Sequence, residues 1–378
     1  MYDMPRKTPA NVKDEIVRLK MEWLSLREIA DIITTNFDYP IIHTTVASVL
    51  RWNALNDYVQ QENITWENAR HYWHKTKLED WSKISVFIKN PIEENKMEKL
   101  HSNMIDDVKK HAPIYPIIKR TISKDWHLLV VDPADIHIGK LASAFETGED
   151  YNNQIAVKRV MEWVQWLLDK SAPYNIDKIL FVGWNDILHI DTPKRQTTSG
   201  TPQDTDGMWY DNYMIAKKLY VDVLELLIAV ADVEFVFNPS NHDFMTGFML
   251  CQTIQAHFSN NKNIKFNCDM SHRKYYQYGK NMIGTTHWDW AKQNDLPLLM
   301  ATEAAIMRSE SKHRYIYWHH IHHKVAKDYI WATFESLRSP SGTDSRHHRN
   351  GYTGSPAAVE GFLHHKERWQ VAKFTHLF

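Results

Sequence analysis

The sequence has little cysteine: only Cys251 and Cys268 occur among its 378 residues. Two cysteines do not make a disulfide framework, so the sequence predicts a protein of the reducing cytoplasm. Long hydrophobic runs are also lacking, and without about 18 consecutive apolar residues no transmembrane helix is expected. The N-terminal residues contain no apolar stretch, so we expect no signal peptide. No membrane partner is therefore predicted.

An excess of charge of one sign is lacking as well. The chain carries 45 Lys and Arg against 46 Asp and Glu, which gives a formal net charge of −1. This balance argues against a strongly basic protein that coats nucleic acid, but it is compatible with a nuclease whose basic surface is local. What the chain does have is 22 histidines and 15 tryptophans. Histidine can ligate metals, and the positions of the histidines must decide whether it does here.

Residues 1–60 are predicted to form three short helices. Apolar residues recur at helical spacing from Val12 onward, and Ser25 followed by Glu28 is typical of a capping box at the start of the second helix. A polar turn precedes the third helix, which we expect to begin at Thr44. The pattern resembles the helix-turn-helix superfamily of DNA-binding modules. With 7 Lys and Arg against 8 Asp and Glu in this segment, charge does not support DNA binding, and a small helical packing or dimerisation module is the alternative.

Residues 61–125 are interpreted as a connector, which contains a loop followed by a helix that ends at Pro113. Residues 126–378 change in character, because short apolar runs alternate with amphipathic stretches, which predicts an α/β domain. The expected strands are 127–133, 178–184, 233–239, 264–268, 273–279, 281–287 and 314–320, and 357–378 is expected to add two strands at a sheet edge. The expected helices are 153–170, 208–231, 244–258 and 296–307.

Five polar clusters follow five of the expected strands. In open α/β sheets, ligands bind beyond the carboxyl ends of the strands, which is where these clusters fall. Asp135 and His137 are two residues apart, and on extended chain both side chains would point the same way and reach one ion. One such cluster is weak support, whereas five together favour a metal site. The clusters lie at 132–139, 183–191, 238–243, 287–289 and 319–323.

The order of these clusters resembles that of the calcineurin-like metallophosphoesterases, D-x-H, G-D, G-N-H-[E/D], H and G-H-x-H, over roughly residues 126–323. Three flanking glycines of that pattern are replaced here, by Asn185, Ser240 and His319. Within the superfamily, the chain is most similar to phage- and prophage-type proteins and to the DNA-repair exonuclease branch. The resemblance implies a two-sheet α/β/β/α sandwich, preceded here by the small all-α module.

The resemblance also implies two divalent metal ions that share one carboxylate. The first ion would be bound by Asp135, His137, Asp186 and His322, and the second by Asp186, Asn241, His287 and His320. Such mixed carboxylate, imidazole and amide ligands suit Mn²⁺, Fe²⁺ or Zn²⁺ better than Ca²⁺. We expect Mn²⁺, with Fe²⁺, Zn²⁺ or Mg²⁺ as alternatives. His242 is the expected catalytic residue, because it can protonate the departing oxygen.

Further residues near these clusters are expected to support the site. His189, Asp191, Asp243 and Asp289 are candidates for holding a ligand or His242 in position. His319 and His323 are expected to point away from the ions, and Asp132 to shape a turn. The long polar segment 192–207 is expected to contact substrate phosphates, and a surface excursion is its alternative. The candidate substrate-binding residues are Lys194, Arg195 and Arg346.

The expected activity is two-metal hydrolysis of a phosphoester, with DNA or RNA as the first candidate substrate and nucleic acid as the expected partner. The alternatives are a protein or nucleotide phosphatase or phosphodiesterase, and a non-catalytic regulatory binding protein. A nuclease predicts binding that weakens steeply with salt, whereas a small-molecule phosphatase predicts little effect. The expected location is the cytoplasm, which would be that of the host if the protein is phage-encoded.

Overall fold

We analysed the chain in a computed structural model. It describes residues 8–22, 24–61, 72–77, 83–88, 91–120, 125–183, 185–287, 291–345, 348, 351 and 354–378. The chain divides into two compact units, residues 1–103 and 104–378. Within the described residues, no helix combines the length and the apolar composition needed to cross a membrane.

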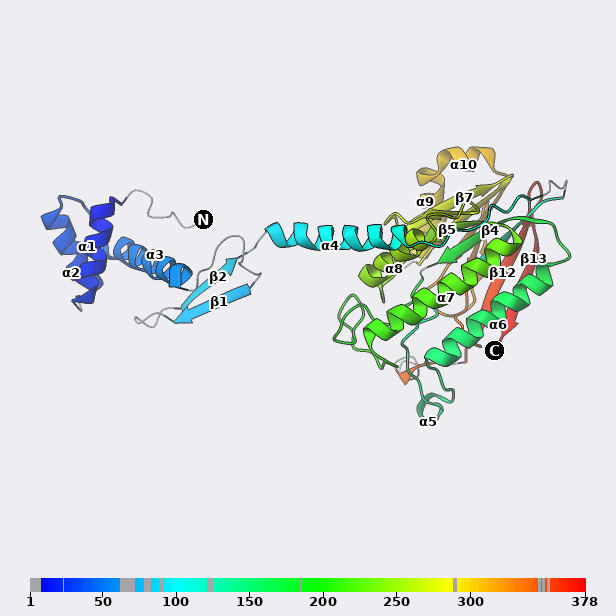
Figure 1. Cartoon of the computed structure of the whole chain (residues 1–378), viewed down its shortest axis with the longest axis horizontal. Coiled ribbons are helices and arrows are strands. Elements are labelled where there is room, and N and C mark those ends of the chain that lie inside the picture. Colours follow the sequence, from blue (N-terminus) through cyan, green and yellow to red (C-terminus); the bar gives the residue numbers. More distant parts are fainter. Residues whose placement is uncertain are drawn as a thin grey trace. The chain divides into compact units, whose positions relative to one another are not determined.

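The first unit begins with three helices, α1 (Ala10–Met21), α2 (Leu26–Asn36) and α3 (His43–Gln61) (Figure 1). The predicted capping box is confirmed: the Ser25 backbone N–H donates to the Glu28 carboxylate over 2.7 Å, and the Glu28 N–H donates to Ser25 Oγ over 3.3 Å. Apolar residues of all three helices, including Ile16, Ile33 and Val46, are buried in one cluster. The similarity to helix-turn-helix modules stays a prediction.

Two paired strands in this unit were not predicted from the sequence. Strand β1 (Tyr72–Lys77) pairs antiparallel with β2 (Lys83–Ile88). Both segments contain β-branched and aromatic residues, which favour strands, although the whole of residues 61–125 was interpreted as a connector. The helix expected before Pro113 is present as α4 (Pro91–Lys110).

The second unit contains two sheets. The six-stranded sheet has the order β13-β12-β3-β4-β5-β6, and the five-stranded sheet has the order β10-β11-β9-β8-β7 (Figure 1). In chain order the strands are β3 (His127–Asp132), β4 (Ile176–Gly183), β5 (Asp232–Phe237), β6 (Ile264–Asn267), β7 (Arg273–Tyr278), β8 (Asn281–Thr286), β9 (His313–Trp318), β10 (Ala326–Asp328), β11 (Thr333–Ser336), β12 (Ala358–His365) and β13 (Gln370–Leu377). Strands β3 to β6 are parallel to one another, as are β8, β9 and β11.

The helices of this unit are α5 (Ala144–Thr147), α6 (Asn153–Ser171), α7 (Trp209–Val230), α8 (Phe244–His257), α9 (Leu296–Glu303) and α10 (Ala305–Glu310). The alternation of β3 assigns its two faces to two cores: Leu129 and Val131 pack toward α6 and α7, whereas Leu128 and Val130 pack between the sheets. A third cluster, with Met300 of α9, covers the outer face of the five-stranded sheet. The predicted α/β/β/α sandwich is confirmed.

Most of the expected elements have the expected bounds. The helix expected at 296–307 is broken, because Ala304 between α9 and α10 has a non-helical backbone with ψ 45°. The short strands β10 and β11 and the four-residue helix α5 were not predicted. The final two strands lie at one edge of the six-stranded sheet, as expected, with β13 outermost.

The two cysteines do not remain separate thiols. Cys251 of α8 and Cys268, one residue beyond β6, form a disulfide that closes a segment with a sequence separation of 17. A single bridge is compatible with the expectation that two cysteines do not make a disulfide framework. It does not support the expectation of a reducing environment, which had rested on the low cysteine count.

The segment before β3 is attached to the second unit by a cap on α7. The Arg120 guanidinium donates to the carbonyls of Ile228 and Val230, the latter over 2.7 Å, and lies 3.3 Å from the Asp232 carboxylate. The last carbonyls of a helix have no partner within the helix, and a cation there also complements the helix dipole.

Arg120→Ala is therefore expected to lower the free energy of unfolding by about 1–2 kcal/mol, because it leaves these carbonyls without a charged donor. Urea denaturation followed by circular dichroism measures this difference. Lys119→Ala, one residue earlier on exposed chain, is the matched control and is expected to change stability by less than ~0.5 kcal/mol. Equal stability of both variants and the wild type would show that the cap contributes nothing.

Candidate metal centre

The carboxyl ends of strands from both sheets supply the candidate ligands. Strands β3, β4 and β5 end at Asp132, Gly183 and Phe237, and β8 and β9 end at Thr286 and Trp318. Each predicted polar cluster begins at or directly after one of these ends. Because β3, β4 and β5 are parallel to one another, and β8 is parallel to β9, the clusters that follow them lie at the same edge of each sheet. Segments far apart in the sequence are thereby brought into one site.

Three groups of three described side chains at this edge could hold a metal ion, and within each group the candidate ligand atoms all lie within 4.8 Å of one another. One group contains only histidines, His137, His189 and His242. The other two combine carboxylate and imidazole: the first group is Asp135, His137 and His322, and the second group is Asp186, His287 and His320. Asn241 joins the second group, since its Oδ1 lies 2.9 Å from His287 Nε2. The structure thus brings together all seven residues that the resemblance implied as ligands.

Asp186 lies between the two groups. Its Oδ2 is 3.3 Å from Nε2 of His287 in the second group and 4.0 Å from Nε2 of His137 in the first. Its other oxygen, Oδ1, accepts the backbone N–H of His242 over 3.0 Å. This contact fixes the carboxylate with one oxygen directed at both groups, which is the arrangement that a shared ligand requires.

The backbone of the ligands is unusual. Among the described residues, seven that are not glycine have a positive φ, and five of these are candidate ligands. They are Asp135 (54°), His137 (52°), Asp186 (53°), His320 (79°) and His322 (56°). Left-handed backbone costs free energy in residues with a side chain, and such strain gathers at functional sites.

This geometry corrects the expectation that Asp135 and His137 project from extended chain. Both residues are left-handed, and successive turns rather than strand alternation bring the side chains together. The loop is held by hydrogen bonds from the Asp135 and His137 N–H groups to the carbonyls of Asn185 and Asp186, over 2.7 and 2.9 Å. The two ligand loops therefore fix one another.

Buried polar atoms at the centre fit a metal ion. Asp135 Oδ1 is fully buried, and no described residue donates a hydrogen bond to it. The Nε2 atoms of His137 and His322 lie 3.2 Å apart. Two unprotonated ring nitrogens cannot hydrogen-bond to each other, whereas both can bind the same cation. An unsatisfied buried carboxylate oxygen is costly unless a cation is bound. The donor set of carboxylate oxygen and imidazole nitrogen suits Mn²⁺, Fe²⁺ or Zn²⁺.

The charges of the site are consistent with this fit. Burial would raise the pKa of the Asp186 carboxyl, but His287 and His242 outweigh burial and lower that pKa below its usual range. For Asp135, His322 and His287 outweigh burial in the same way and lower the pKa. Burial holds the pKa of His137 well below its ordinary value. Ionised carboxylates and neutral imidazoles are the forms that ligate metals.

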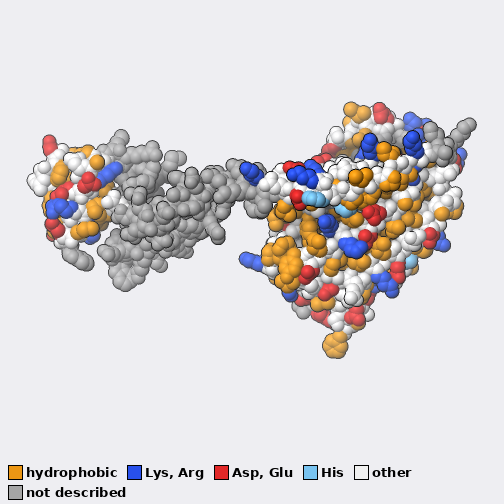
Figure 2. Space-filling model, viewed as in Figure 1, with side chains coloured by type: hydrophobic (Ala, Val, Ile, Leu, Met, Phe, Trp, Pro, Cys, Tyr) orange, Lys and Arg blue, Asp and Glu red, His pale blue; other side chains and the backbone are white. Residues whose placement is uncertain are grey.

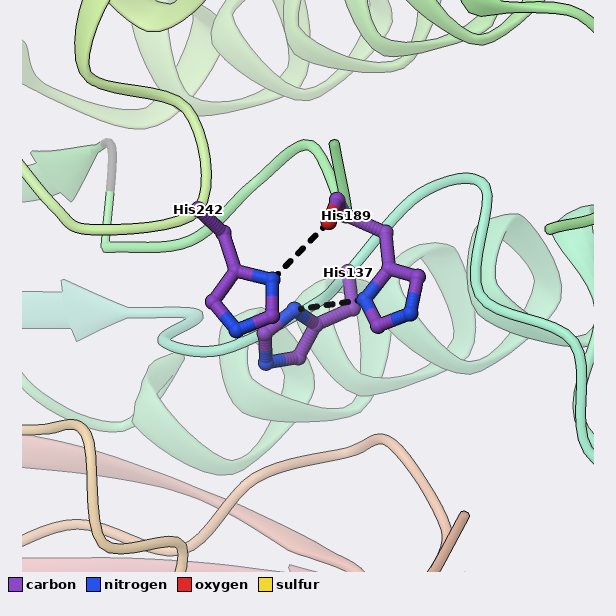
Figure 3. A group of neighbouring side chains, drawn as sticks. All are labelled: His137, His189 and His242. Carbon is purple, nitrogen blue, oxygen red and sulfur yellow. Dashed lines mark hydrogen bonds between the residues drawn. The ribbon is translucent and has the colours of Figure 1, made fainter. Parts of the chain in front are cut away.

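His189 and His242 lie beside His137 (Figure 3). The Nδ1 atoms of His189 and His137 are 3.3 Å apart, and His242 Nδ1–H donates to the His189 carbonyl over 2.8 Å. Burial, followed by the nearby His242, holds the pKa of His189 well below its ordinary value. A neutral His189 can accept the Nδ1 proton of His137 and leave His137 Nε2 for a metal. This is the supporting contact that the sequence analysis considered for His189.

The buried carboxylate of Asp243 has other partners than expected. Asp243 does not contact the His242 ring; its oxygens accept Ser240 Oγ–H over 2.5 Å and Leu188 N–H over 2.9 Å. Burial, and then the charge of Asp186, raise the pKa of Asp243 to about 7. The side chains of the neighbouring residues 242 and 243 point in different directions. The Asp243 carboxylate therefore holds the loop and does not orient the His242 ring. Ser240, which replaces a motif glycine, uses its hydroxyl to accept the Asp186 N–H over 3.0 Å.

Asp191 holds a helix and no ligand. Its carboxylate accepts the backbone N–H groups of Met245 and Thr246, over 3.2 and 2.8 Å, at the start of α8. It also accepts the hydroxyls of Thr198 and Thr246. A carboxylate at a helix N-terminus is stabilised by the unpaired N–H groups and by the helix dipole. The expectation that Asp191 supports a metal ligand directly is therefore wrong.

Five of the seven candidate ligands line a cavity of about 480 Å³, which we call the metal cavity; they are His137, Asp186, Asn241, His320 and His322. The expected phosphate-binding residues Lys194 and Arg195 are exposed and do not line it. The same loop contributes four neutral polar side chains instead, those of Thr197, Ser199, Thr201 and Gln203. The loop is ordered, and Thr198 N–H donates to the Asn241 carbonyl over 3.2 Å. It is therefore part of the site, but through other residues than predicted.

The remaining expectations have mixed outcomes. His319 is fully buried, with Nε2 3.0 Å from Asp132 Oδ1, so it points away from the ligands as expected. Asp132 is the last residue of β3 and pairs with His319, in addition to any influence on the turn. His323 is exposed but lines the metal cavity. Asp289 and Arg346 lie outside the described residues.

Sequence reasoning missed the residues that attach the C-terminal loop to the site. Ser339 Oγ donates to the Asp135 carbonyl over 2.6 Å. Lys140 is fully buried and contacts the Gly342 carbonyl at 2.6 Å and the Asp344 carboxylate at 3.1 Å. Asp344 in turn lines the metal cavity. The only local signal was that Lys140 directly follows the first ligand motif.

No protein-family model matches the sequence, and no protein with a curated description matches it. Three solved structures that align with the chain are an archaeal phosphodiesterase, YfcE, a phosphoesterase from E. coli, and Vps29 from Chaetomium thermophilum. The archaeal enzyme is 7% identical, with 67% of this chain and 99% of that chain covered and a TM-score of 0.31. For YfcE these values are 13%, 66%, 98% and 0.31, and for Vps29 they are 10%, 67%, 97% and 0.30. At such values, function has to be inferred from the side chains of the site.

Proposed function

We propose that this protein is a metal-dependent phosphoester hydrolase that cleaves phosphodiester bonds of nucleic acid. The observation that carries the proposal is the pair of ligand groups joined by Asp186 in one cavity. Two adjacent sites with a shared carboxylate suit a phosphoryl group, which offers several anionic oxygens to two cations. Five candidate ligands have left-handed backbone, and because such strained residues gather at functional sites, this supports a functional role for the site.

The first ion would be held by Asp135, His137 and His322 together with Asp186. The second would be held by Asp186, Asn241, His287 and His320. When bound, such ions act as Lewis acids and lower the pKa of bound water, so that hydroxide is present near neutral pH. His189 would keep His137 in the tautomer that ligates, through the contact between their Nδ1 atoms.

His242 is suited to transfer a proton to the leaving oxygen. Its Nδ1–H donates to the His189 carbonyl, which leaves Nε2 for the substrate. His242 lines the metal cavity, and its backbone N–H holds Asp186. The ring is therefore tied to the carboxylate that joins the two ligand groups. A general acid in this position facilitates departure of a poor leaving group such as a sugar alkoxide.

Nucleic acid as the substrate is supported by features outside the ligands. The N-terminal helices resemble a DNA-binding module, and Lys194 and Arg195 are exposed on the loop that lines the metal cavity. On the face of the second unit shown in Figure 2, Lys and Arg are intermixed with Asp and Glu and form no continuous basic stripe. Recognition would then depend on local contacts near the cavity.

The proposal is tested by hydrolysis of bis-p-nitrophenyl phosphate and of labelled single- and double-stranded DNA with added Mn²⁺. We expect cleavage of the chromophore and of DNA, and loss of both activities with a chelator because the ligands alone cannot activate water. Restoration by fresh Mn²⁺ controls for unfolding. Cleavage of the chromophore but of neither DNA substrate nor RNA would replace the nuclease with a small-molecule phosphodiesterase. Metal binding without any hydrolysis would favour a regulatory protein.

A further inference from the structure

A second cavity adjoins the metal cavity. It has a volume of about 440 Å³, and we call it the side cavity. Ile321, His322 and His323 line both cavities. His322 belongs to the first ligand group, so the two cavities meet at a candidate metal ligand. A phosphoryl group at the ligands would therefore have space on two sides.

The walls of the side cavity are tied to the ligand loops. Ser355, which lines the cavity, donates its hydroxyl to the His322 carbonyl over 3.0 Å. Ser339, another lining residue, donates to the Asp135 carbonyl over 2.6 Å. The serines that line the side cavity therefore hydrogen-bond to the backbone of two candidate ligands, which come from different segments of the chain. The position of the side cavity relative to the ligands is therefore fixed by direct contacts.

The charge beside the side cavity is positive. Lys324 and Arg338 line it, and both belong to an ion-pair cluster with Lys373 and the carboxylates of Glu335 and Glu360. Arg338 lies 2.9 Å from Glu360, and Lys373 lies 2.9 Å from Glu335. The cluster contains three cations and two anions, so one positive charge is not balanced within it. Such an excess near a partly buried cavity favours an anionic group.

Two glycines also expose their backbone to the side cavity. Gly351 and Gly354 line it with φ values of 76° and 84°, and a Cβ placed on either would meet no atom within 4 Å. The space beside these glycines is therefore empty of described protein atoms. Left-handed glycines without side chains allow a ligand to approach the backbone closely, as phosphate-binding loops do.

We propose that the side cavity holds the second ester arm of a phosphodiester, together with the next phosphate along that arm. This inference rests on the proposed phosphodiester hydrolysis and adds a substrate requirement to it. A phosphomonoester has one organic arm and needs only the metal cavity, whose loop supplies neutral hydroxyl and amide groups. A dinucleotide with a terminal phosphate has two arms and a second anion, which match both cavities and the unbalanced charge.

The test uses the full-length protein with Mn²⁺ and a variant that fills the side cavity, Thr343→Trp. Thr343 is half-buried and lines the cavity. We expect the ratio of kcat/KM for a terminally phosphorylated thymidine dinucleotide to kcat/KM for p-nitrophenyl phosphate to fall at least ~10-fold, about 1.4 kcal/mol of lost arm binding. Thr302→Trp, exposed on α9 and outside both cavities, is the matched control and should keep the wild-type ratio.

A second variant addresses the charge. Lys373→Gln removes one of the three cations of the cluster, which leaves two cations and two carboxylates, and it does not fill the cavity because Lys373 does not line it. We expect it to raise KM about 3- to 10-fold for the dinucleotide with a terminal phosphate, and to have a smaller effect on the same dinucleotide without it. Thermal unfolding of both variants checks that the fold is retained. An unchanged ratio in Thr343→Trp, or equal effects of Lys373→Gln on the two dinucleotides, would overturn the proposal.

Binding of the phosphorylated dinucleotide, measured by isothermal titration, separates the two proposals. If the wild type hydrolyses no ester but Thr343→Trp still weakens binding about 10-fold, the proposed hydrolysis fails and the side cavity stands as a binding site. If the wild type hydrolyses the dinucleotide and Thr343→Trp neither weakens binding nor changes the ratio, only the further inference fails.

Discussion

Replacing Asp186 with Asn is expected to remove both metal ions and at least about 1000-fold of kcat/KM, which corresponds to ~4 kcal/mol. Asp186 Oδ2 approaches His287 of the second group over 3.3 Å and His137 of the first group over 4.0 Å. Asp135 Oδ1 also approaches both groups, over 3.7 Å to His322 and 3.9 Å to His287, but the resemblance implies Asp186 as the shared ligand. Asn retains its shape and can still accept the His242 N–H, but a neutral amide is a weak ligand and cannot balance two cations. Elemental analysis of purified protein and hydrolysis of bis-p-nitrophenyl phosphate measure the two losses.

Asp191→Asn is the matched control for this variant. Asp191 is also buried and lies five residues along the same segment, but it caps α8 and does not ligate. We expect the Asp191→Asn variant to bind both ions, and its free energy of unfolding to be lower by about 1 kcal/mol. If Asp186→Asn kept its full metal content, the assignment of Asp186 as a shared ligand would be wrong. Loss of metal from both variants would point to a general loosening of the loop.

His242→Ala is expected to keep both ions but to lose roughly 100- to 10,000-fold of activity on DNA, which is the usual range for a general acid. The ring belongs to neither of the two groups that contain a carboxylate. Alanine loses the contact of the ring with the His189 carbonyl but retains the backbone N–H that donates to Asp186. Metal content should therefore equal that of the wild type. His111→Ala, an exposed histidine outside both cavities, serves as the control for histidine removal.

The leaving group provides a sharper version of this test. A nitrophenolate departs without protonation, whereas a sugar alkoxide needs a proton. The loss in His242→Ala should consequently be much smaller for bis-p-nitrophenyl phosphate than for DNA. Equal losses on the two substrates would show that His242 acts in binding or in positioning Asp186. Full activity on DNA would remove His242 from the mechanism.

Much of the fold was accessible from the sequence because the buried strands are short, continuous and apolar. Strand β3 and its partner β4 are buried where they pair, and such runs are easily recognised between amphipathic helices. The candidate ligands could be selected from the sequence because each follows one of the expected strands in a known motif order. The capping box at Ser25 was equally local, requiring only two residues three positions apart.

What the sequence did not predict depends on contacts between distant segments. Asp191 was expected near the ligands, but only the packing of α8 against its loop decides that it accepts the Thr246 N–H. Lys194 and Arg195 were selected for their charge, whereas the turn of the loop directs Thr197 and Ser199 into the cavity. Lys140 and Asp344 are separated by more than 200 residues, so their pairing left no local pattern.

The left-handed ligand positions also bear on how such a site can change during evolution. Asp, Asn and His accept this backbone more readily than β-branched or bulky residues, and all three are metal ligands. Exchanges among them at Asp135, His137, Asp186, His320 or His322 would alter the metal preference while the loops keep their course. A β-branched residue at the same positions would strain the backbone and supply no ligand of this kind. The backbone thereby favours Asp, Asn and His at these positions, and single substitutions among these three residue types would change which metal ion is preferred.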